Sequence, residues 1–185
     1  TSPIVKQHKI RAKAIDRQLE QTHIAVGFRT TDMYDSDIYI LDILRIILSG
    51  NMSSRLFTNL REKRGLTYNV SIDASEYEQY GHFTILTSVD KRKVLDYSDK
   101  GVKKQGALTV IRDTLQELIN NGITDSELNK AKGYIQGKLT LATEDALHLS
   151  DYNGKIIVFD QKYFVPIQDL YEIHYSLITK DSVNK

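Results

Sequence analysis

The stretch GNMSSRLFTNLREKRGLTY, running from Gly50 to Tyr68, decides the fold of this chain. A glycine suited to the end of one helix is followed by a short polar helix, and then by the first residues of an alternating strand. Gly65 is suited to end that short helix, because glycine adopts the backbone conformation found at helix C-termini without steric cost. The stretch predicts a helix–turn–strand unit with Arg61 and Tyr68 on either side of the turn.

The residues before this stretch predict a strand and a buried helix. Ile24, Val26 and Phe28 alternate with smaller or polar residues, which is typical of a strand. The segment 37–48 is apolar on nearly every side, so we expect a helix buried on most of its circumference, with Gly50 just beyond its end. Either Ser53 or Ser54 is expected to cap the next helix.

The residues after Gly65 predict a β-hairpin. Strict alternation places five side chains on one face of a half-buried strand: Leu66, Tyr68, Val70, Ile72 and Ala74. This prediction puts Tyr68 on the same face as the apolar residues. A turn at 76–79 then leads into a second alternating strand over 81–89.

The C-terminal half is predicted to be mainly helical. Six lysines and arginines in the segment 90–106 favour a solvated loop. A helix ending at Gly122 is followed by a capping box from Thr124 to Glu127 and by a long helix. Gly133 and Gly137 inside that long helix suggest close packing by a neighbour. Smaller helices follow, and the last begins at Thr179 and is truncated by the end of the chain.

These elements predict an α+β domain in the order β-α-α-β-β-α-α. Antiparallel strands with helices gathered on one face give a two-layer architecture. Residues 1–20 are polar without a clear period and are interpreted as a lead-in, while residues 21–185 form one domain.

Composition excludes several classes of function. The formal net charge of +1 gives no reason to expect nucleic acid, and no apolar run is long enough for a membrane span. There is no cysteine, so disulfides and thiolate metal sites are excluded, and the compartment cannot be read from the sequence. The chain begins at Thr1 without signal-like features, and we expect it to be part of a longer protein.

Segments along nearly the whole chain resemble one family, the insulinase-like zinc peptidases that include pitrilysin and the mitochondrial processing peptidase. The likeness is to the C-terminal-type domain of that family. It is carried, in the expected order, by 21–28, 44–57, 60–68, 122–132 and 178–183.

The resemblance implies a processing-peptidase-like half of a clamshell, in which two homologous halves enclose a chamber. The half that binds zinc carries an inverted His-x-x-Glu-His motif, and no histidine of this chain begins such a motif: His8, His23, His82, His148 and His174. Zinc in the complete enzyme is therefore expected on another domain or subunit, with no metal site in this chain. The chain alone should be inactive.

The resemblance also implies roles for two residues. Arg61 and Tyr68 match the arginine and tyrosine that this half of the family lends to the zinc site, where they stabilise the tetrahedral intermediate or bind substrate carbonyls. Without the resemblance, Arg61 reads as a solvated charge and Tyr68 as a core tyrosine. The loop residues Gly50, Asn51, Ser53 and Ser54 either contact the substrate or the facing half, or merely connect two helices.

The implied function is the substrate-closing half of a zinc metalloendopeptidase. Its expected partners are a peptide substrate and a homologous zinc-bearing half, either upstream in the same polypeptide or a separate subunit. In isolation the domain could form a homodimer through the face that meets the other half. The alternative is a catalytically inactive structural or interaction subunit with the same fold.

Overall fold

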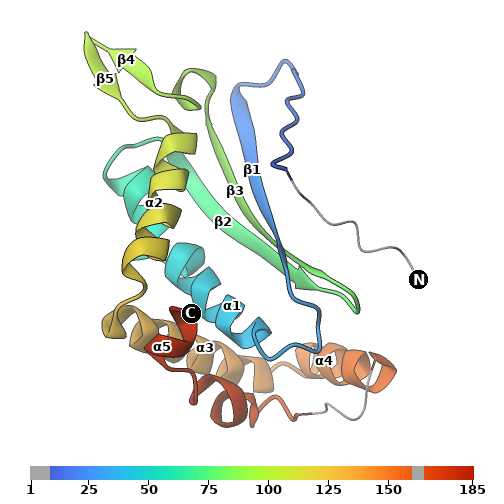
Figure 1. Ribbon diagram of the computed structural model, residues 1–185. Coiled ribbons are helices and arrows are strands. Elements are labelled where there is room, and N and C mark those ends of the chain that lie inside the picture. Colours follow the sequence, from blue (N-terminus) through green and yellow to red (C-terminus); the bar gives the residue numbers. More distant parts are fainter. Residues whose placement is uncertain (1–8, 160–164) are drawn as a thin grey trace.

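The computed structural model describes residues 9–159 and 165–185 (Figure 1). Its first half contains β1 (Gln21–Thr30), α1 (Ile38–Arg45) with a π-helical extension (Ile46–Gly50), a short π-helix (Phe57–Glu62), β2 (Thr67–Glu76) and β3 (Gly81–Asp90). Its second half contains β4 (Tyr97–Asp99), β5 (Val102–Lys104), α2 (Ala107–Asn121), α3 (Asp125–Thr143), α4 (Ala146–Phe159), a π-helical turn (Tyr171–Tyr175) and α5 (Lys180–Val183). None of the helices in the described ranges is long and apolar enough to cross a membrane.

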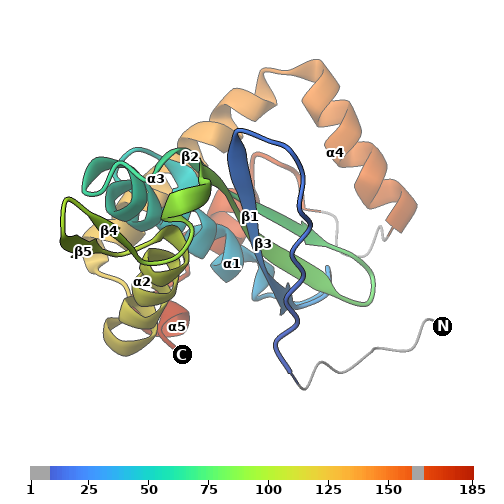
Figure 2. The same ribbon diagram turned by 90° about the horizontal axis from the view of Figure 1, so that it is seen from above.

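The main sheet has three antiparallel strands in the order β1-β3-β2. Its alternating apolar side chains point to one face, which α1 and α2 cover, while the other face is open (Figures 1 and 2). The predicted two-layer α+β class is confirmed. The order of the main elements also follows the prediction, apart from a small β4–β5 hairpin inserted before α2.

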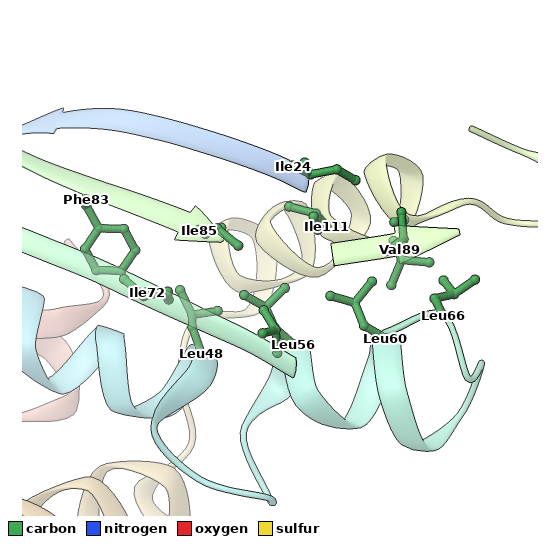
Figure 3. Packing of buried hydrophobic residues seen from close by; sticks show 13 residues of the cluster. Ile24, Leu48, Leu56, Leu60, Leu66, Ile72, Phe83, Ile85, Val89 and Ile111 are labelled. Atoms are coloured by element: carbon green, nitrogen blue, oxygen red, sulfur yellow. The ribbon is translucent and has the colours of Figure 1, made fainter. Parts of the chain in front are cut away.

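Two hydrophobic clusters hold the layers together. The first lies between the sheet and the helices and contains Leu56, Leu60 and Ile85, each with no exposed surface (Figure 3). The second lies between α1, α3 and the C-terminal segment and includes Ile43 and Ala131. The helical segment 37–50 contributes to both clusters, because its apolar side chains surround it as the sequence predicted.

Two predicted features of the first loop are wrong in detail. Gly50 is the last residue of the π-helical extension, not the residue beyond the helix end, and Asn51 follows it in an extended conformation. A Cβ atom at Gly50 would lie 2.9 Å from a methyl group of Ile46, so close packing explains the glycine. The next helix starts without a serine cap, because Asn51 Oδ1 accepts from the Ser53 amide at 2.9 Å and the Ser54 hydroxyl is buried.

The predictions for the later segments succeed where the signal is local. Thr124 and Glu127 form the expected capping box, and Thr179 caps α5. The basic segment 90–106 is not simply a loop, because it folds into the β4–β5 hairpin, although all its lysines except the partly buried Lys93 are exposed. The interpretation of Gly133 and Gly137 is wrong: open space surrounds the position of a Cβ atom at each.

Residues 9–20 form no helix or strand and are exposed. Their role as a lead-in stays a prediction, as does the continuation of the last helix beyond the present chain. The lead-in's first eight residues lie outside the described residues.

Candidate functional site

The short helix Phe57–Glu62 presents Arg61 on its outer side. The neighbouring Leu60 is fully buried against the sheet, so the helix is fixed to the core at that position. The Arg61 guanidinium lies 4.9 Å from the centre of the Phe57 ring, a cation–π contact that leaves its N–H groups available. It has no hydrogen-bond or ion-pair partner among residues 9–159 and 165–185.

Gly65 makes the turn that joins this helix to β2, as predicted. Its φ of 57° is in the left-handed region, which favours glycine. The Gly65 amide donates to the Arg61 carbonyl at 2.9 Å, and the Leu66 amide donates to the Leu60 carbonyl at 2.8 Å. These two bonds end the helix and start the strand within a few residues.

Tyr68 lies on the opposite side of β2 from the one that alternation predicted. Thr67 pairs with Val89 of β3 and Val70 pairs with Thr87, so three positions along β2 match two along β3. This β-bulge turns Thr67 into the core, where it is 6% exposed, and leaves Tyr68 80% exposed. The prediction that Tyr68 shares a face with Val70 is wrong, and so is its interpretation as a core tyrosine.

Two buried threonine hydroxyls hold the bulge together. Thr67 Oγ1 lies 2.8 Å from the Ser88 carbonyl and 2.7 Å from the Asn69 carbonyl, while Thr87 Oγ1 lies 2.8 Å from the Asn69 carbonyl. Each hydroxyl has one hydrogen, so donation by Thr67 to Ser88 and by Thr87 to Asn69 satisfies both carbonyls. Thr67 Oγ1 also accepts from the Asn69 amide at 3.2 Å.

Sequence reasoning missed both threonines. The available signal was Thr87, a polar residue at an inward-facing position of a strand whose other inward-facing residues are apolar. A hydroxyl at such a position needs a partner inside the protein. An irregular backbone nearby, with unpaired carbonyl groups, is one source of that partner.

Arg61 and Tyr68 line the same hollow, which we call the donor hollow. It has a volume of about 520 Å³. Its lining also includes Gly65, Leu66 and Thr67 from the turn, together with the charged residues Glu20, Asp90 and Lys93. The structure therefore brings together the two residues that the sequence singled out.

The charges around the donor hollow are partly engaged within the protein. Hydrogen bonds from Arg92 lower the pKa of Asp90 to about 2, so this carboxylate stays ionised and paired with Arg92. The Lys93 ammonium lies 3.4 Å from the Gly65 carbonyl. By contrast, neither the Arg61 guanidinium nor the Tyr68 hydroxyl is bonded to any residue in the described ranges. Both groups have hydrogens to donate to a ligand.

The loop that contains Gly50, Asn51, Ser53 and Ser54 does not belong to the donor hollow. Asn51, Ser53 and Ser54 line a separate hollow of about 40 Å³ together with residues of α3. The Ser53 amide donates to the Asn51 side chain and the Ser54 amide to the Asn51 carbonyl, so neither is free. A role of this loop in contacting the substrate or the facing half stays a prediction.

Arg55, just after this loop, anchors the short helix to the start of α3. Its guanidinium donates to both carboxylate oxygens of Glu127, at 2.6 and 2.8 Å, and to the Gly122 carbonyl at 2.8 Å. The ion pair lowers the pKa of Glu127 to about 2, chiefly through the hydrogen bond from Arg55. The bidentate geometry makes this a directional anchor.

The residues of this chain do not fit a catalytic zinc site. The sequence has no histidine pair with the spacing of the inverted motif. In the described part of the chain, no group of three or more histidine, aspartate or glutamate side chains is placed to hold a metal ion. The donor hollow presents the Arg61 guanidinium and the Tyr68 hydroxyl, and both groups have hydrogens to donate to a carbonyl oxygen.

Comparison with known proteins shows which proteins the chain is similar to. The family model described as the peptidase M16 inactive domain matches residues 1–134. The uncharacterized zinc protease YmxG of Bacillus subtilis is 34% identical over 139 residues, covering 75% of this chain and 32% of that protein. An uncharacterized zinc protease of Rickettsia felis is 32% identical over 171 residues, covering 92% of this chain and 39% of that protein.

Solved structures show the same fold. The crystal structure of a peptidase M16 inactive domain from Pseudomonas fluorescens has a TM-score of 0.73 at 23% identity, covering 89% of this chain and 36% of that one. A protease from Helicobacter pylori has a TM-score of 0.68 at 14% identity, covering 90% and 37%. The chain spans about a third of the length of the curated relatives YmxG and its Streptomyces coelicolor counterpart, 32% and 29%.

Proposed function

Since the chain belongs to the peptidase M16 family and matches its inactive domain, we propose that it closes over the peptide substrate of a zinc protease. In this role it donates hydrogen bonds from Arg61 and Tyr68 to the substrate carbonyl groups at the cleaved bond. The zinc is held by a homologous half, in the same polypeptide or in a separate subunit. Named zinc proteases among the relatives support the presence of that metal in the complete enzyme.

The observation that carries the proposal is the donor hollow. Arg61 and Tyr68 come from different elements, yet both line it, and the bulge in β2 exposes the tyrosine. If Arg61 were simply a solvated charge, it would not require Tyr68 beside it. Packing within the domain does not explain Tyr68 either, because this residue is 80% exposed. A ligand that accepts hydrogen bonds gives both side chains a use.

The chemistry follows from charge development at the carbonyl oxygen. As a nucleophile adds to a peptide carbonyl, negative charge grows on its oxygen, and donors already in place stabilise that charge. Arg61 carries a permanent positive charge with several N–H groups, and Tyr68 supplies a neutral O–H group. Loss of one such donor typically costs about 2.7–4 kcal/mol in the activation barrier.

The test is to replace each donor in the complete protein. Arg61→Ala and Tyr68→Phe should each lower kcat for peptide hydrolysis roughly a hundred- to a thousand-fold. Zinc content and circular dichroism should not change, because both side chains are exposed and Leu60, not Arg61, fixes the short helix to the core. Peptide hydrolysis is followed by mass spectrometry of the products.

Control variants are available at another arginine and another tyrosine. Arg64 is bonded to the Asn59 carbonyl and the Gln105 side chain and does not line the donor hollow, so Arg64→Ala should keep nearly full activity. Tyr80→Phe removes a hydroxyl from another exposed tyrosine. Normal turnover in Arg61→Ala and Tyr68→Phe would rule out the proposed roles. A complete protein that binds zinc but cleaves no peptide would favour an inactive structural subunit.

A further inference from the structure

The open face of the sheet carries a second hollow, which we call the sheet hollow. It has a volume of about 260 Å³. Its outward-facing lining comes from all three strands: His23, Ala25, Asn69, Ser71, Leu86 and Ser88. The helices and the hydrophobic core lie on the opposite face of the sheet, so these outward-facing side chains are not part of the core (Figure 2).

The sheet hollow continues from the donor hollow along the strands. Gln21 of β1 and Asp90 of β3 pair with each other and line the donor hollow. The next pair on the same face, His23 and Ser88, lines the sheet hollow. Alternate residues of a strand are about 7 Å apart, so the two hollows are neighbours at that spacing.

The bulge in β2 joins the two hollows. It places two consecutive residues, Tyr68 and Asn69, opposite the single residue Ser88. Tyr68 lines the donor hollow and Asn69 lines the sheet hollow. The same irregularity that exposes the tyrosine therefore adds a wall to the second hollow.

The linings of the two hollows differ in chemistry. The donor hollow contains Arg61, Lys93 and Asp90, whereas the sheet hollow contains no acidic or basic side chain apart from the imidazole of His23. Ala25 and Leu86 give it an apolar floor, and Leu86 is 38% exposed. A charged group enclosed there would lose water without gaining a partner of opposite charge.

The His23–Ser88 contact leaves a hydrogen-bonding group for a ligand. His23 Nδ1 lies 2.8 Å from Ser88 Oγ. When the serine donates in this pair, the ring proton is on Nε2, which has no partner in the described part of the chain. The sheet hollow therefore combines apolar contact with a hydrogen-bonding group.

We propose that the sheet hollow binds an uncharged side chain of the peptide substrate. The residue concerned lies two positions from the one whose carbonyl meets Arg61 and Tyr68. An extended peptide directs every second side chain to the same side, about 7 Å apart, which matches the spacing of the two hollows. This inference rests on the proposed function, because it takes the donor hollow as the place of cleavage.

The test compares two serines on the same strand and face. Ser71 lines the sheet hollow, whereas Ser75, two alternations further along β2, does not. The complete protein and its Ser71→Phe and Ser75→Phe variants digest a mixture of decapeptides randomised at the central positions. Mass spectrometry of the products gives the preference at each position relative to the cleaved bond.

The wild-type protein should disfavour Asp, Glu, Lys and Arg at a position two residues from the cleavage site. The phenyl ring introduced by Ser71→Phe fills the sheet hollow. The ratio of kcat/KM for a peptide with Leu or Gln at that position to kcat/KM for the peptide with Gly at that position should therefore fall roughly tenfold or more. Ser75→Phe should leave this ratio unchanged. Equal cleavage of charged and uncharged peptides by the wild type, or the same ratio in both variants, would overturn the inference.

A second measurement separates the two proposals. Binding of labelled Leu, Gly and Lys peptides to the zinc-depleted complete protein is followed by fluorescence anisotropy. If Ser71→Phe is the one variant that loses the preference for the Leu peptide, the sheet hollow is supported. This holds even if Arg61→Ala keeps full turnover, a result that would refute the donor role and leave the sheet hollow standing. Equal binding of all peptides by wild type and variants refutes the sheet hollow alone.

Discussion

At the scale of single residues, Thr67 decides where Tyr68 points. With its hydroxyl inside the core, Thr67 takes the position opposite Val89 that Tyr68 would occupy in a regular strand. Its hydroxyl lies within hydrogen-bonding distance of the Asn69 and Ser88 carbonyl groups beside the bulge. Thr67 therefore sets the direction of Tyr68 through the backbone of the bulge.

Replacing Thr67 by valine should destabilise the bulge and weaken the contribution of Tyr68. The substitution keeps the shape but leaves buried carbonyl groups with fewer donors, at a cost of about 1–3 kcal/mol. Urea denaturation of the 185-residue chain measures that loss. Thr84→Val, on the open face of β3, should change stability by less than about 0.5 kcal/mol.

Kinetics of the double variant distinguish positioning from general loss of stability. If Thr67 acts through Tyr68, Thr67→Val/Tyr68→Phe should be about as slow as Tyr68→Phe alone, because the lost interaction is the same. If the fold losses in kcat of the two single variants instead multiply in the double variant, Thr67 and Tyr68 contribute independently to kcat and this prediction is wrong.

The sequence predicted Arg61 and Tyr68 as a pair but not the direction of the tyrosine. The choice of the pair came from the family resemblance, whereas local signals predicted the turn between them, a helix end at Gly65 and a strand after it. The direction depends on how Thr67 and Val70 pair with β3, which is a contact between distant parts of the chain. Strict alternation of Leu66, Tyr68 and Val70 therefore led to the wrong face.

At the scale of elements, the Arg55–Glu127 ion pair fixes the short helix to the start of α3. Glu127 also belongs to the capping box, accepting from the Thr124 amide at 2.8 Å. One carboxylate thus serves both the helix start and the anchor. Its pKa of about 2, against an ordinary 4.5, means that folding favours the ionised form.

This lowered pKa predicts an acid-dependent loss of stability. The stabilisation by Glu127 is fully present above pH 4.5 and declines as the pH falls towards about 2, because the unfolded chain binds the proton first. Glu127→Gln should cost about 1.5–3 kcal/mol at neutral pH. The difference in unfolding free energy between wild type and variant should shrink below pH 4.5, as measured by urea denaturation.

Asp125 provides the control in the same turn of α3. Its ion pair with Lys180 is exposed, so Asp125→Asn should change stability by at most about 1 kcal/mol. A wild-type-to-Glu127→Gln difference that stays constant down to pH 2 would show that the charge of Glu127 does not contribute to folding.

Elements with local signals were predictable from sequence, and the others were not. The capping boxes at Thr124 and Thr179 involve residues three apart, so the sequence contains all the information. The β4–β5 hairpin has strands of three residues with mostly exposed side chains, which provide no apolar alternation. The packing reason for Gly50 depends on the π-helical geometry that brings it against Ile46.

At the scale of the whole molecule, α4 contributes no buried residue over 146–158, the part whose side chains the structure describes. It extends beyond the rest of the fold in Figure 2. Leu147, Ile157 and Val158 on it are 80%, 60% and 77% exposed. Side chains of this kind favour contact with another protein surface. The facing half of the complete enzyme is the partner that the proposed function supplies.

The 185-residue chain alone is expected to self-associate through α4. Burial of exposed apolar side chains drives this contact, so it should persist at high salt. Ile157→Glu should shift the chain towards monomer in sedimentation velocity, whereas Lys155→Glu, on the same helix, should have a smaller effect. A monomer at every concentration reached would contradict this expectation, as would equal effects of the two substitutions.

The turn between the two donors has a consequence for timing. Leu60 and Leu66, on either side of Arg61 and Gly65, are both buried, and a backbone hydrogen bond of 2.8 Å joins them. The turn is therefore held at both ends by the core and moves together with it. Under the proposed function, the Arg61 guanidinium and the Tyr68 phenol therefore reach a peptide carbonyl together, and neither can be in place without the other.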